Sequence, residues 1–235
     1  MAAGKIQDYH VHSFYSDGES TIPSIIRACA NAGCVELAIT DHVDQDGAFT
    51  FIPEFRRGNA LPDYIEAIHA LKDEACIQFN VNVHVGIELS TTTNEFKAPI
   101  AKNIVPLADG IEIILIEGLD VNGATSLALA TRGILEAAGC KNKPIFIAHP
   151  VFAEVLEEIE LLIDNDIGLE LNESKFSPVH RQNLDKILDH VVEAGLKRFR
   201  FTMGSDAHSA SDAGKVPIVH KYAVERGIIE SLYWL

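Results

Sequence analysis

The sequence predicts an α/β barrel of seven parallel strands, TIM-barrel-like, with a helix after each strand. Strand-like and helix-like apolar segments alternate seven times along the 235 residues, which is typical of a parallel sheet whose crossovers are helices. Metal-binding side chains follow five of the expected strands. A closed barrel brings the ends of so many strands to one rim, whereas an open sheet usually offers only two or three at its switch point.

The first half of the chain supplies four expected strands and three helices. The strands are the apolar runs at residues 5–12, 36–42, 81–90 and 110–117. The helices have apolar residues at helical spacing and cover residues 22–32, 62–79 and 95–108. Thr21 and Pro23 stand at the expected start of the first helix and Gly33 follows its end, as helix-starting and helix-ending residues do.

The second half continues the alternation. Its expected strands cover residues 144–150, 168–172 and 198–206, and its expected helices cover residues 124–138, 153–164, 178–194 and 211–225. Ser177 precedes Pro178 as a helix start, and Gly139 and Gly195 follow helix ends. The longest connection, residues 43–61, is expected to be a lid or substrate loop at the rim. No repeat or linker divides the chain, so we expect a single domain of residues 1–235.

The composition is that of a globular protein with a strong negative charge. Hydrophobic residues make up 47%, charged residues 23%, and the net charge is −15. This charge repels a polyanion, so long nucleic acid is disfavoured as a substrate. The four cysteines form no Cys-x-x-Cys pair, which favours reduced intracellular thiols. Without an apolar signal region or a run near the ~18 apolar residues of a membrane span, we expect a cytoplasmic protein with no membrane partner.

Five short motifs carry the functional signal, and each follows an apolar run. They are His10-Val11-His12, Asp41-His42, Glu88, His149-Pro150 and Asp206-Ala207-His208. Imidazole and carboxylate together suit divalent zinc, manganese or iron, and none of the motifs contains a thiolate. The sequence therefore predicts a metal site on the rim of the barrel.

Strand parity refines this prediction, because residues two apart in a strand share a face. The side chains expected to point inward are Asp8, His10, His12, Gly86, Glu88, Ile147, His149, Gly204, Asp206 and His208. The neighbours Tyr9, Val11, Ile87 and Leu89 are then expected to face the helices. Asp8 lies one pleat deeper than His10, so we expect it to support a histidine ligand rather than to bind metal.

These motifs resemble those of the polymerase-and-histidinol-phosphatase (PHP) family of metal-dependent phosphoesterases. The matching segments are Asp8-Tyr9-His10-Val11-His12-Ser13 with Tyr15-Ser16-Asp17-Gly18, Ile39-Thr40-Asp41-His42, Gly86-Ile87-Glu88, Ile147-Ala148-His149-Pro150 and Gly204-Ser205-Asp206-Ala207-His208. The resemblance runs from residue 8 to residue 208, and the order of the five motifs makes it specific. It implies a distorted seven-stranded (β/α)7 barrel, in agreement with the strand count above.

The resemblance also implies a metal ligand set. The residues that match the family's ligands are His10, His12, Asp17, His42, Glu88, His149, Asp206 and His208. In the family pattern the first metal takes His10, His12, Glu88 and Asp206. Glu88 bridges to a second metal that also uses His149, while Asp17, His42 and His208 hold a third. We therefore expect two or three divalent ions of zinc, manganese or iron, with magnesium also possible.

One ligand of the family pattern is missing from this chain. The family usually places a histidine at the end of the fourth strand, where this sequence has Ile116. Glu117 lies one residue beyond it, and strand neighbours face opposite sides. Glu117 is thus expected to replace the histidine only if the strand has ended or bulged there.

Other residues have an ordinary alternative to a role in the site. Lys175 follows the sixth strand, where it could hold a phosphate or be a solvated loop lysine. Arg56 and Arg57, in the long second loop, are the next candidates for phosphate contact. His84 is expected near the barrel floor. The histidines expected on helices as surface or core residues are His69, His180, His190 and His220.

The function favoured by these observations is metal-dependent hydrolysis of a small phosphomonoester, such as a sugar phosphate, histidinol phosphate or a nucleotide. The residues expected to act in the reaction are Glu88, Asp206, His208 and His42. Two alternatives stay open: an amidohydrolase-like metal hydrolase, whose barrels also begin with a His-x-His strand, and a non-catalytic metal-binding or regulatory barrel. The sequence does not specify an oligomeric state.

Overall fold

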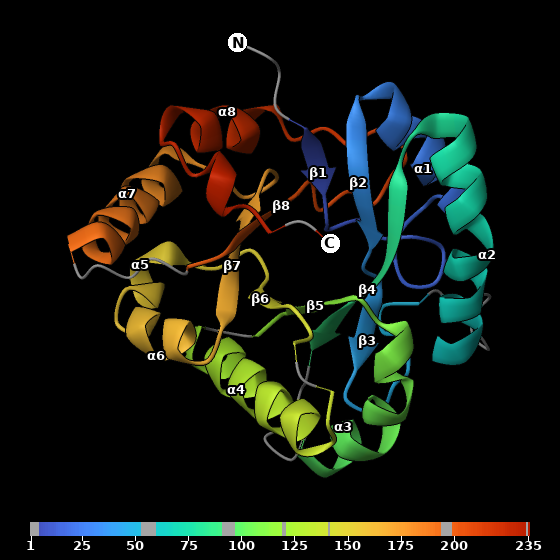
Figure 1. Cartoon of the computed structure of the whole chain (residues 1–235), viewed down its shortest axis with the longest axis horizontal. Coiled ribbons are helices and arrows are strands. Elements are labelled where there is room, and N and C mark those ends of the chain that lie inside the picture. The colour runs from blue at the N-terminus through green and yellow to red at the C-terminus, as the bar shows by residue number, and fades with distance from the viewer. Residues whose placement is uncertain are drawn as a thin grey trace.

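The computed structural model describes residues 5–52, 60–90, 97–118, 121–140, 142–193, 199–233 and 235, and its centre is a parallel sheet. The strands are β1 (Ile6–Asp8), β2 (Cys34–Ile39), β3 (His42–Asp44), β4 (Asn82–Ser90), β5 (Ile113–Ile116), β6 (Ile145–Ile147), β7 (Ile167–Asn172) and β8 (Phe201–Gly204). They pair in the order β1-β2-β4-β5-β6-β7-β8, and β3 pairs with β4. Helices surround this sheet on its outer side (Figure 1).

The expected second strand is interrupted. β2 pairs with residues 82–85 of β4, and β3 pairs with residues 88–90 of the same strand. At the break, Thr40 N–H donates to the Val11 carbonyl (2.9 Å) and the Asp41 carbonyl accepts from Glu88 N–H (3.0 Å). β2 and β3 are therefore two parts of one strand position, and the predicted count of seven positions is confirmed.

The sheet curves round until β8 meets the chain that continues from β1. Tyr9 N–H donates to the Met203 carbonyl (2.8 Å), and Asp206 N–H donates to the His10 carbonyl (2.9 Å). One step further, His12 N–H donates to the Ala207 carbonyl (2.9 Å). These main-chain bonds close the barrel beside its rim, so the predicted distorted (β/α)7 barrel is confirmed.

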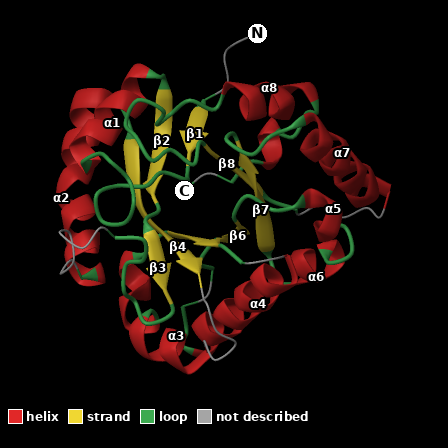
Figure 2. Ribbon diagram, turned by 180° about the vertical axis from the view of Figure 1, so that it is seen from behind, coloured by secondary structure: helices red, strands yellow, loops and turns green. Residues whose placement is uncertain are grey.

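The helices form a ring around the strands (Figure 2). They are α1 (Ile22–Asn31), α2 (Leu61–Phe79), α3 (Lys97–Asn103), α4 (Val121–Ala137), α5 (Phe152–Val155), α6 (Ile159–Asp164), α7 (Pro178–Glu193) and α8 (Pro217–Glu225), with the 3-10 helices η2 (Val105–Gly110) and η3 (Ile229–Ser231). No helix in the described part of the chain has the length and apolar character to cross a bilayer.

Three of the predicted helices differ from the observed ones, and proline accounts for two of the differences. The expected helix 95–108 gives way to η2 near Pro106, and the expected helix 211–225 begins only at Pro217. Proline lacks a backbone N–H and disfavours a helical residue before it. The expected helix 153–164 is divided into α5 and α6. Gly33 and Gly139 end helices with φ of +83° each, as predicted, while Gly195 lies outside the described residues.

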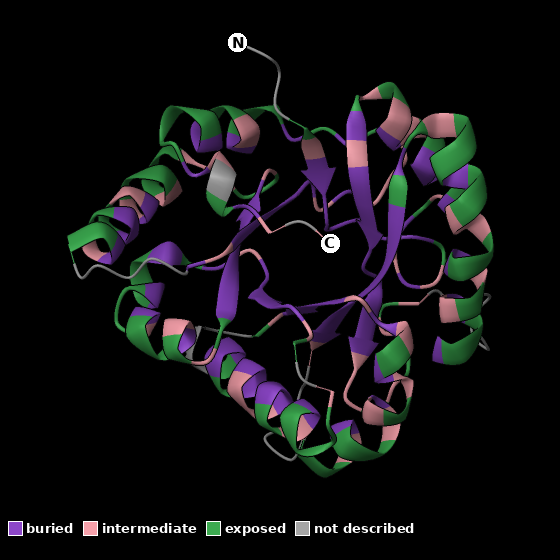
Figure 3. Ribbon diagram, viewed as in Figure 1, coloured by how far each residue is buried: buried purple, intermediate pink, exposed green. Residues whose placement is uncertain are grey.

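The barrel wall has one apolar layer on its outer side and another on its inner side. Most strand residues are buried and are drawn in purple in Figure 3. The larger layer lies between sheet and helices and includes Val11, Ile87, Leu89, Ile116 and Ile147. The smaller layer fills the barrel interior with Tyr9, Ala38, Ile113, Leu115, Phe146 and Ala148, against which Tyr233 and Leu235 pack. Three parity predictions are therefore wrong: Tyr9 points into the barrel, Ile147 points towards the helices, and Asp8 faces outward to Ser205 and Gly214.

The C-terminal segment covers the barrel end opposite the predicted ligands. Tyr233 N–H donates to the Phe201 carbonyl (2.8 Å), and the Tyr233 carbonyl accepts from Gln7 Nε2 (2.9 Å). Leu235 N–H donates to the Tyr9 hydroxyl (3.2 Å). This segment closes the barrel floor beneath the interior layer.

Candidate metal centre

The predicted ligands come together at the C-terminal ends of the strands. Seven of the eight lie in a strand or shortly after one, and Asp17 reaches the same place from the loop after β1. Three groups of donor atoms form there, with all atoms of a group within 4.8 Å of one another. The groups are His10 with His12 and Glu88; His12 with Asp17, His42 and His208; and His42 with Glu88 and Glu117. That they bind metal stays a prediction.

The first group lies deepest in the barrel. His10 Nε2 is 3.2 Å and His12 Nε2 3.5 Å from the same oxygen, Glu88 Oε2. Asp206 Oδ1 approaches both rings, at 3.7 Å from His10 Nε2 and 3.5 Å from His12 Nε2. Two imidazole nitrogens and two carboxylates thus converge on one point, as a divalent ion requires.

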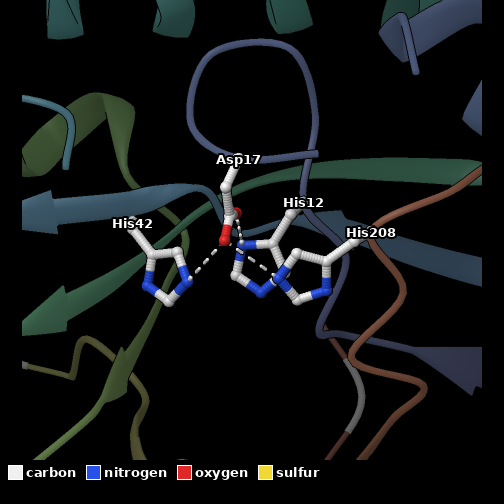
Figure 4. A group of neighbouring side chains, drawn as sticks. All are labelled: His12, Asp17, His42 and His208. Atoms are coloured by element: carbon white, nitrogen blue, oxygen red, sulfur yellow. Dashed lines mark ion pairs between the residues drawn. The ribbon is translucent and has the colours of Figure 1, made fainter. Parts of the chain in front are cut away.

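The second group surrounds Asp17, whose carboxylate points between three imidazoles (Figure 4). Asp17 Oδ2 is 3.2 Å from His208 Nε2 and 3.8 Å from His42 Nε2, and Oδ1 is 3.9 Å from His12 Nδ1. The His12 ring stacks between the other two, with centroid distances of 4.4 Å to His42 and 4.3 Å to His208. His12 therefore turns Nε2 to the first group and Nδ1 to the second.

The third group contains Glu117, which directly follows β5. Glu117 Oε2 is 3.7 Å from His42 Nδ1, and Glu117 Oε1 is 3.8 Å from His149 Nε2. Glu88 lies beside both histidines, with Oε2 3.0 Å from His42 Nδ1 and Oε1 3.1 Å from His149 Nε2. The parity assigned to this strand was wrong: Leu115 points into the barrel and Ile116 towards the helices. Simple alternation therefore brings Glu117 inward without a bulge.

Polar atoms of the centre are left without well-formed hydrogen bonds. His12 Nδ1, His42 Nδ1 and Glu88 Oε2 are buried and make no hydrogen bond of good geometry among the described residues, although His42 Nδ1 and Glu88 Oε2 lie 3.0 Å apart. Leaving such an atom unpaired costs about 1–3 kcal/mol. Three unpaired atoms on neighbouring residues indicate a missing partner at their common focus. Their nitrogen and oxygen donors fit a divalent cation.

The electrostatics of the centre also favour a cation. Burial raises the pKa of Glu88, but His10 and His149 outweigh burial and hold that pKa well below its ordinary value. The pKa of Asp206 is likewise lowered, because the neighbouring histidines outweigh its burial. Burial lowers the pKa of His12, so this imidazole has a lone pair to offer. The carboxylates therefore stay ionised, and despite burial they raise the pKa of His10, His42, His149 and His208, whose protons a bound cation would displace.

Asp41 shapes the loop that presents Asp17 and is not itself a member of the three groups. Its carboxylate accepts from Ser13 N–H (2.8 Å), Ser13 Oγ (2.6 Å), Ser16 N–H (2.9 Å) and Ser16 Oγ (2.5 Å). Gly18 follows, and a Cβ there would lie 2.4 Å from the His12 carbonyl oxygen. The turn therefore needs both the buried acceptor and the glycine to hold Asp17 over His12.

Asp8 does not support a histidine ring, contrary to prediction. Its carboxylate accepts from Ser205 N–H (2.8 Å), Ser205 Oγ (2.7 Å) and Gly214 N–H (2.7 Å). Gly214 packs against Cys29 and Ala32 at the end of α1, so Asp8 faces outward and braces the seam between β1 and β8. Desolvation by burial raises the pKa of Asp8 to about 6 despite these hydrogen bonds.

Glu170 on β7 has the role that was expected of Asp8. Its buried carboxylate lies 2.9 Å from His10 Nδ1 through Oε1, and Oε2 accepts from His149 N–H (2.6 Å). A Cβ on Gly204 would lie 2.2 Å from Glu170 Oε1 and 2.4 Å from His10 Cβ, so only glycine fits there. Sequence reasoning missed Glu170, although an inward carboxylate at the end of an apolar strand was a usable signal.

Two of the predicted ligands lie where the strand conformation has ended. His149 has φ of +27° and Asp206 has φ of +58°, a region that non-glycine residues rarely occupy. The Glu170 contact to His149 N–H and the His10 carbonyl contact to Asp206 N–H hold these conformations. Such conformations persist only where the surrounding structure fixes them, and here they turn both side chains into the centre.

Of the three residues predicted to contact phosphate, the structure describes Lys175 alone. Lys175 lies on the rim after β7, with Nζ 3.7 Å from Asp206 Oδ2 and a side chain that is 56% exposed. Arg56 and Arg57 lie outside the described residues. A cavity of about 610 Å³ opens beside Asp206 and His208, and its walls include Glu19, Ser174 and Lys215.

Most of the remaining histidines lie away from the centre, but His180 lines a small cavity together with His149, Glu170 and Lys175. His69, His180, His190 and His220 are on α2, α7 and α8 and belong to none of the three groups. His84 lies deeper in the barrel on β4, with Nε2 2.7 Å from Glu36 Oε2 and Nδ1 3.3 Å from Glu112 Oε1. The expected floor position of His84 agrees with these contacts.

Comparison with known sequences places the motifs in a family context. A sequence profile described as the PHP domain matches residues 8–174. A probable phosphatase of Thermoanaerobacter sp. strain X514 is 24% identical over 237 residues, covering 97% of this chain and 89% of that protein. A probable phosphatase of Thermoanaerobacter pseudethanolicus matches with the same values.

Comparison with solved structures supports the same barrel. The histidinol phosphate phosphatase of Lactococcus lactis, solved with zinc, L-histidinol and phosphate, superposes with a TM-score of 0.68 at 19% identity. That match covers 97% of this chain and 95% of the other. The phosphotriesterase homology protein of Escherichia coli, solved with phosphate in its active site, gives 0.56 at 10% identity, covering 97% and 96%. At these identities the likeness shows the fold.

Proposed function

We propose that this chain, which belongs to the PHP domain family, is a metal-dependent phosphatase that hydrolyses a small phosphomonoester. The observation that carries the proposal is the rim cluster of histidines and carboxylates in which His12 Nδ1, His42 Nδ1 and Glu88 Oε2 are buried and unpaired. The curated relatives named as probable phosphatases support the same chemistry.

The residues proposed to hold two or three divalent ions are the predicted set of eight. Zinc, manganese and iron suit this mixture of imidazole and carboxylate, and magnesium suits its oxygens. When bound, such ions stabilise charge on phosphoryl oxygens and lower the pKa of a bound water. No serine or cysteine nucleophile is needed for a reaction of this kind.

The protein's own side chains prepare the reaction by position and charge. Glu170 and Asp41 are not ligands in this proposal; they fix His10 and the loop that carries Asp17. Lys175 is proposed to hold the substrate phosphate, because its exposed ammonium group lies at the rim beside Asp206. We also propose that four residues act directly in the reaction: Glu88, Asp206, His208 and His42.

A small substrate agrees with the surroundings of the centre. The cavity of about 610 Å³ beside Asp206 and His208 has room for the alcohol part of a phosphomonoester. The net charge of −15 opposes a long polyanion. Sugar phosphates, histidinol phosphate and nucleotides are therefore the substrate classes to compare.

A phosphomonoester panel tests the proposal. The protein, freed of metal and then supplied separately with manganese, zinc, iron or magnesium, should release inorganic phosphate from at least one class, and a chelator should stop the release. Metal-loaded protein that releases no phosphate from any of them would instead favour the non-catalytic binding barrel. Turnover of cyclic amides without phosphatase activity would favour the amidohydrolase alternative.

A further inference from the structure

The carboxylate of Glu117 faces the centre at the end of the fourth strand position, where the family pattern has a histidine. It lies between His42 and His149, at 3.7 Å and 3.8 Å from their nearest ring nitrogens. We propose that Glu117 is a metal ligand which, with Glu88 and His42, forms an oxygen-rich position that prefers manganese to zinc. This inference rests on the proposed metal-dependent function and adds a ligand and a metal preference to it.

The backbone fixes the direction of the Glu117 side chain. Glu117 N–H donates to the Leu89 carbonyl (3.0 Å), so the residue continues the pairing of β5 with β4. Leu115 is the register partner of Glu88, and both side chains point into the barrel. Glu117 is two residues further on, which places its carboxylate on the same face and one step nearer the rim.

The charges at this position are not balanced by a permanent cation among the described residues. The ion pairs of Glu88 are with His10, His12, His42 and His149, and those of Glu117 are with His42 and His149. Burial and the negative charge of Glu88 raise the pKa of Glu117. A divalent ion between the two carboxylates would remove this repulsion.

Two buried unpaired atoms point at the same position. His42 Nδ1, on a side chain that is 9% exposed, and Glu88 Oε2, on one that is 0% exposed, lie 3.0 Å apart but make no hydrogen bond of good geometry in the described structure. These two atoms and one Glu117 oxygen all lie within 4.8 Å of one another. That spacing suits three ligands of one ion after small side-chain adjustments.

The donor types set the metal preference. The Asp17 group offers three imidazoles and one carboxylate, whereas the Glu117 group offers one imidazole and two carboxylates. Imidazole suits zinc, while carboxylate oxygen suits manganese and magnesium. A neutral imidazole has one lone pair, so His42 serves one group at a time. When Nδ1 is engaged here, His12, Asp17 and His208 remain for the other group.

Metal titration of the whole protein and of three variants tests the inference. Mn²⁺ binding is followed by electron paramagnetic resonance, and Zn²⁺ binding by competition with a chromophoric chelator. Glu117→Gln should weaken the binding of one Mn²⁺ equivalent roughly tenfold to a hundredfold, as loss of a charged contact does. Glu117→His should keep that equivalent but shift its preference towards Zn²⁺ by about tenfold or more.

Glu112→Gln is the matched control. Glu112 immediately precedes β5 at its other end, where it pairs with His84 and Lys72, so the same substitution there should leave metal binding unchanged. Equal Mn²⁺ number and affinity in wild type and Glu117→Gln would overturn the role of Glu117 and leave the proposed phosphatase standing. Wild-type protein that binds neither ion would overturn the proposed metal centre and this inference together.

Discussion

The two ends of the barrel both bury histidine among carboxylates, yet they differ in how completely the polar atoms are paired. At the floor, His84 has a glutamate at each ring nitrogen, Glu36 at 2.7 Å and Glu112 at 3.3 Å. Glu112 also contacts Lys72 and accepts from Val85 N–H (2.9 Å). At the rim, three buried donor and acceptor atoms make no hydrogen bond within the described residues, although they lie in ion-pair contacts.

This difference separates a structural cluster from a binding one. The floor contains a permanent cation, because the Lys72 ammonium lies against the Glu112 carboxylate. Among the described residues, the rim gathers Asp17, Glu88, Glu117, Glu170 and Asp206, and the lysine that pairs with these carboxylates is Lys175, at its edge. Unpaired atoms at a common focus, rather than histidine and carboxylate as such, therefore indicate where a cation belongs.

The largest effect should come from removing the carboxylate shared by the rim groups. Glu88→Ala should abolish phosphatase turnover, with a loss on the order of a thousandfold or more in kcat/KM, because it removes a contact to four histidines and several kcal/mol of transition-state stabilisation. Steady-state kinetics, metal analysis and circular dichroism check this. Glu36→Ala at the floor should retain turnover, and substantial activity in Glu88→Ala would contradict a shared carboxylate.

A smaller effect should follow from exchanging one acceptor oxygen for a donor at each end. Glu170 accepts through both oxygens, from His149 N–H and Asn172 Nδ2 on one side and facing His10 on the other. Glutamine has one acceptor oxygen, so Glu170→Gln either loses the His149 contact or donates to His10 Nδ1. In the second case the His10 proton moves to Nε2, the atom that faces Glu88.

We expect Glu170→Gln to weaken metal binding roughly tenfold to a hundredfold, the usual effect of losing a partner behind a ligand. Chelator competition measures this change. Glu36→Gln alters an equally buried carboxylate–imidazole contact at the floor, so it should lower the melting temperature and leave metal affinity unchanged. Equal metal affinities for the two variants would show that Glu170 only stabilises the fold.

The edge of the rim gives a third prediction. If Lys175 holds the substrate phosphate, Lys175→Ala should raise KM with a smaller effect on kcat, and kcat/KM should fall roughly tenfold to a hundredfold. Metal content should not change. Lys221, on α8, pairs with Glu225 at 3.8 Å and is not among the residues that line the cavity, so Lys221→Ala is the control. Unchanged kinetics for Lys175→Ala would return phosphate binding to the metals or to Arg56 and Arg57.

Sequence reasoning could find the rim because its residues follow strand ends, and a barrel brings those ends together whatever the details of each strand. It placed His10, His12, Glu88 and His208 by motif alone. It failed where a strand ends early: φ of +27° turns His149 inward although Ile147 points outward. It also missed Glu170, because the partner of that residue, His10, is 160 positions away in the chain.

The interior contacts were equally hidden from the sequence. Tyr9 leaves the expected outer face to pack with Phe146 and Leu115 and lies edge-on to His84 at 5.8 Å. Asp8 therefore faces away from the barrel interior, and its carboxylate accepts hydrogen bonds from Ser205 Oγ and Gly214 N–H. Alternation predicts faces only along a regular strand, and β1 has three residues with a register shift between Ile6 and Gln7.

The smallest effect concerns the floor alone and depends on pH. Burial lowers the pKa of His84, but hydrogen bonds to Glu112 and Glu36 outweigh burial and raise that pKa above its ordinary value. A raised pKa means that the folded state holds the proton more tightly than the unfolded state. The stabilisation is therefore complete below the ordinary histidine pKa of about 6.5 and is lost as pH rises through the folded value.

Chemical unfolding of the metal-free protein across this range should show a falling free energy of unfolding, and His84→Gln should flatten that fall. The groups facing His84 are Glu36, Glu112 and the Tyr9 ring, and none belongs to the rim, so metal affinity of His84→Gln at fixed pH should equal that of wild type. A pH profile that is the same in wild type and His84→Gln would show that the floor histidine is neutral, and that the two ends of the barrel differ less than their hydrogen bonds indicate.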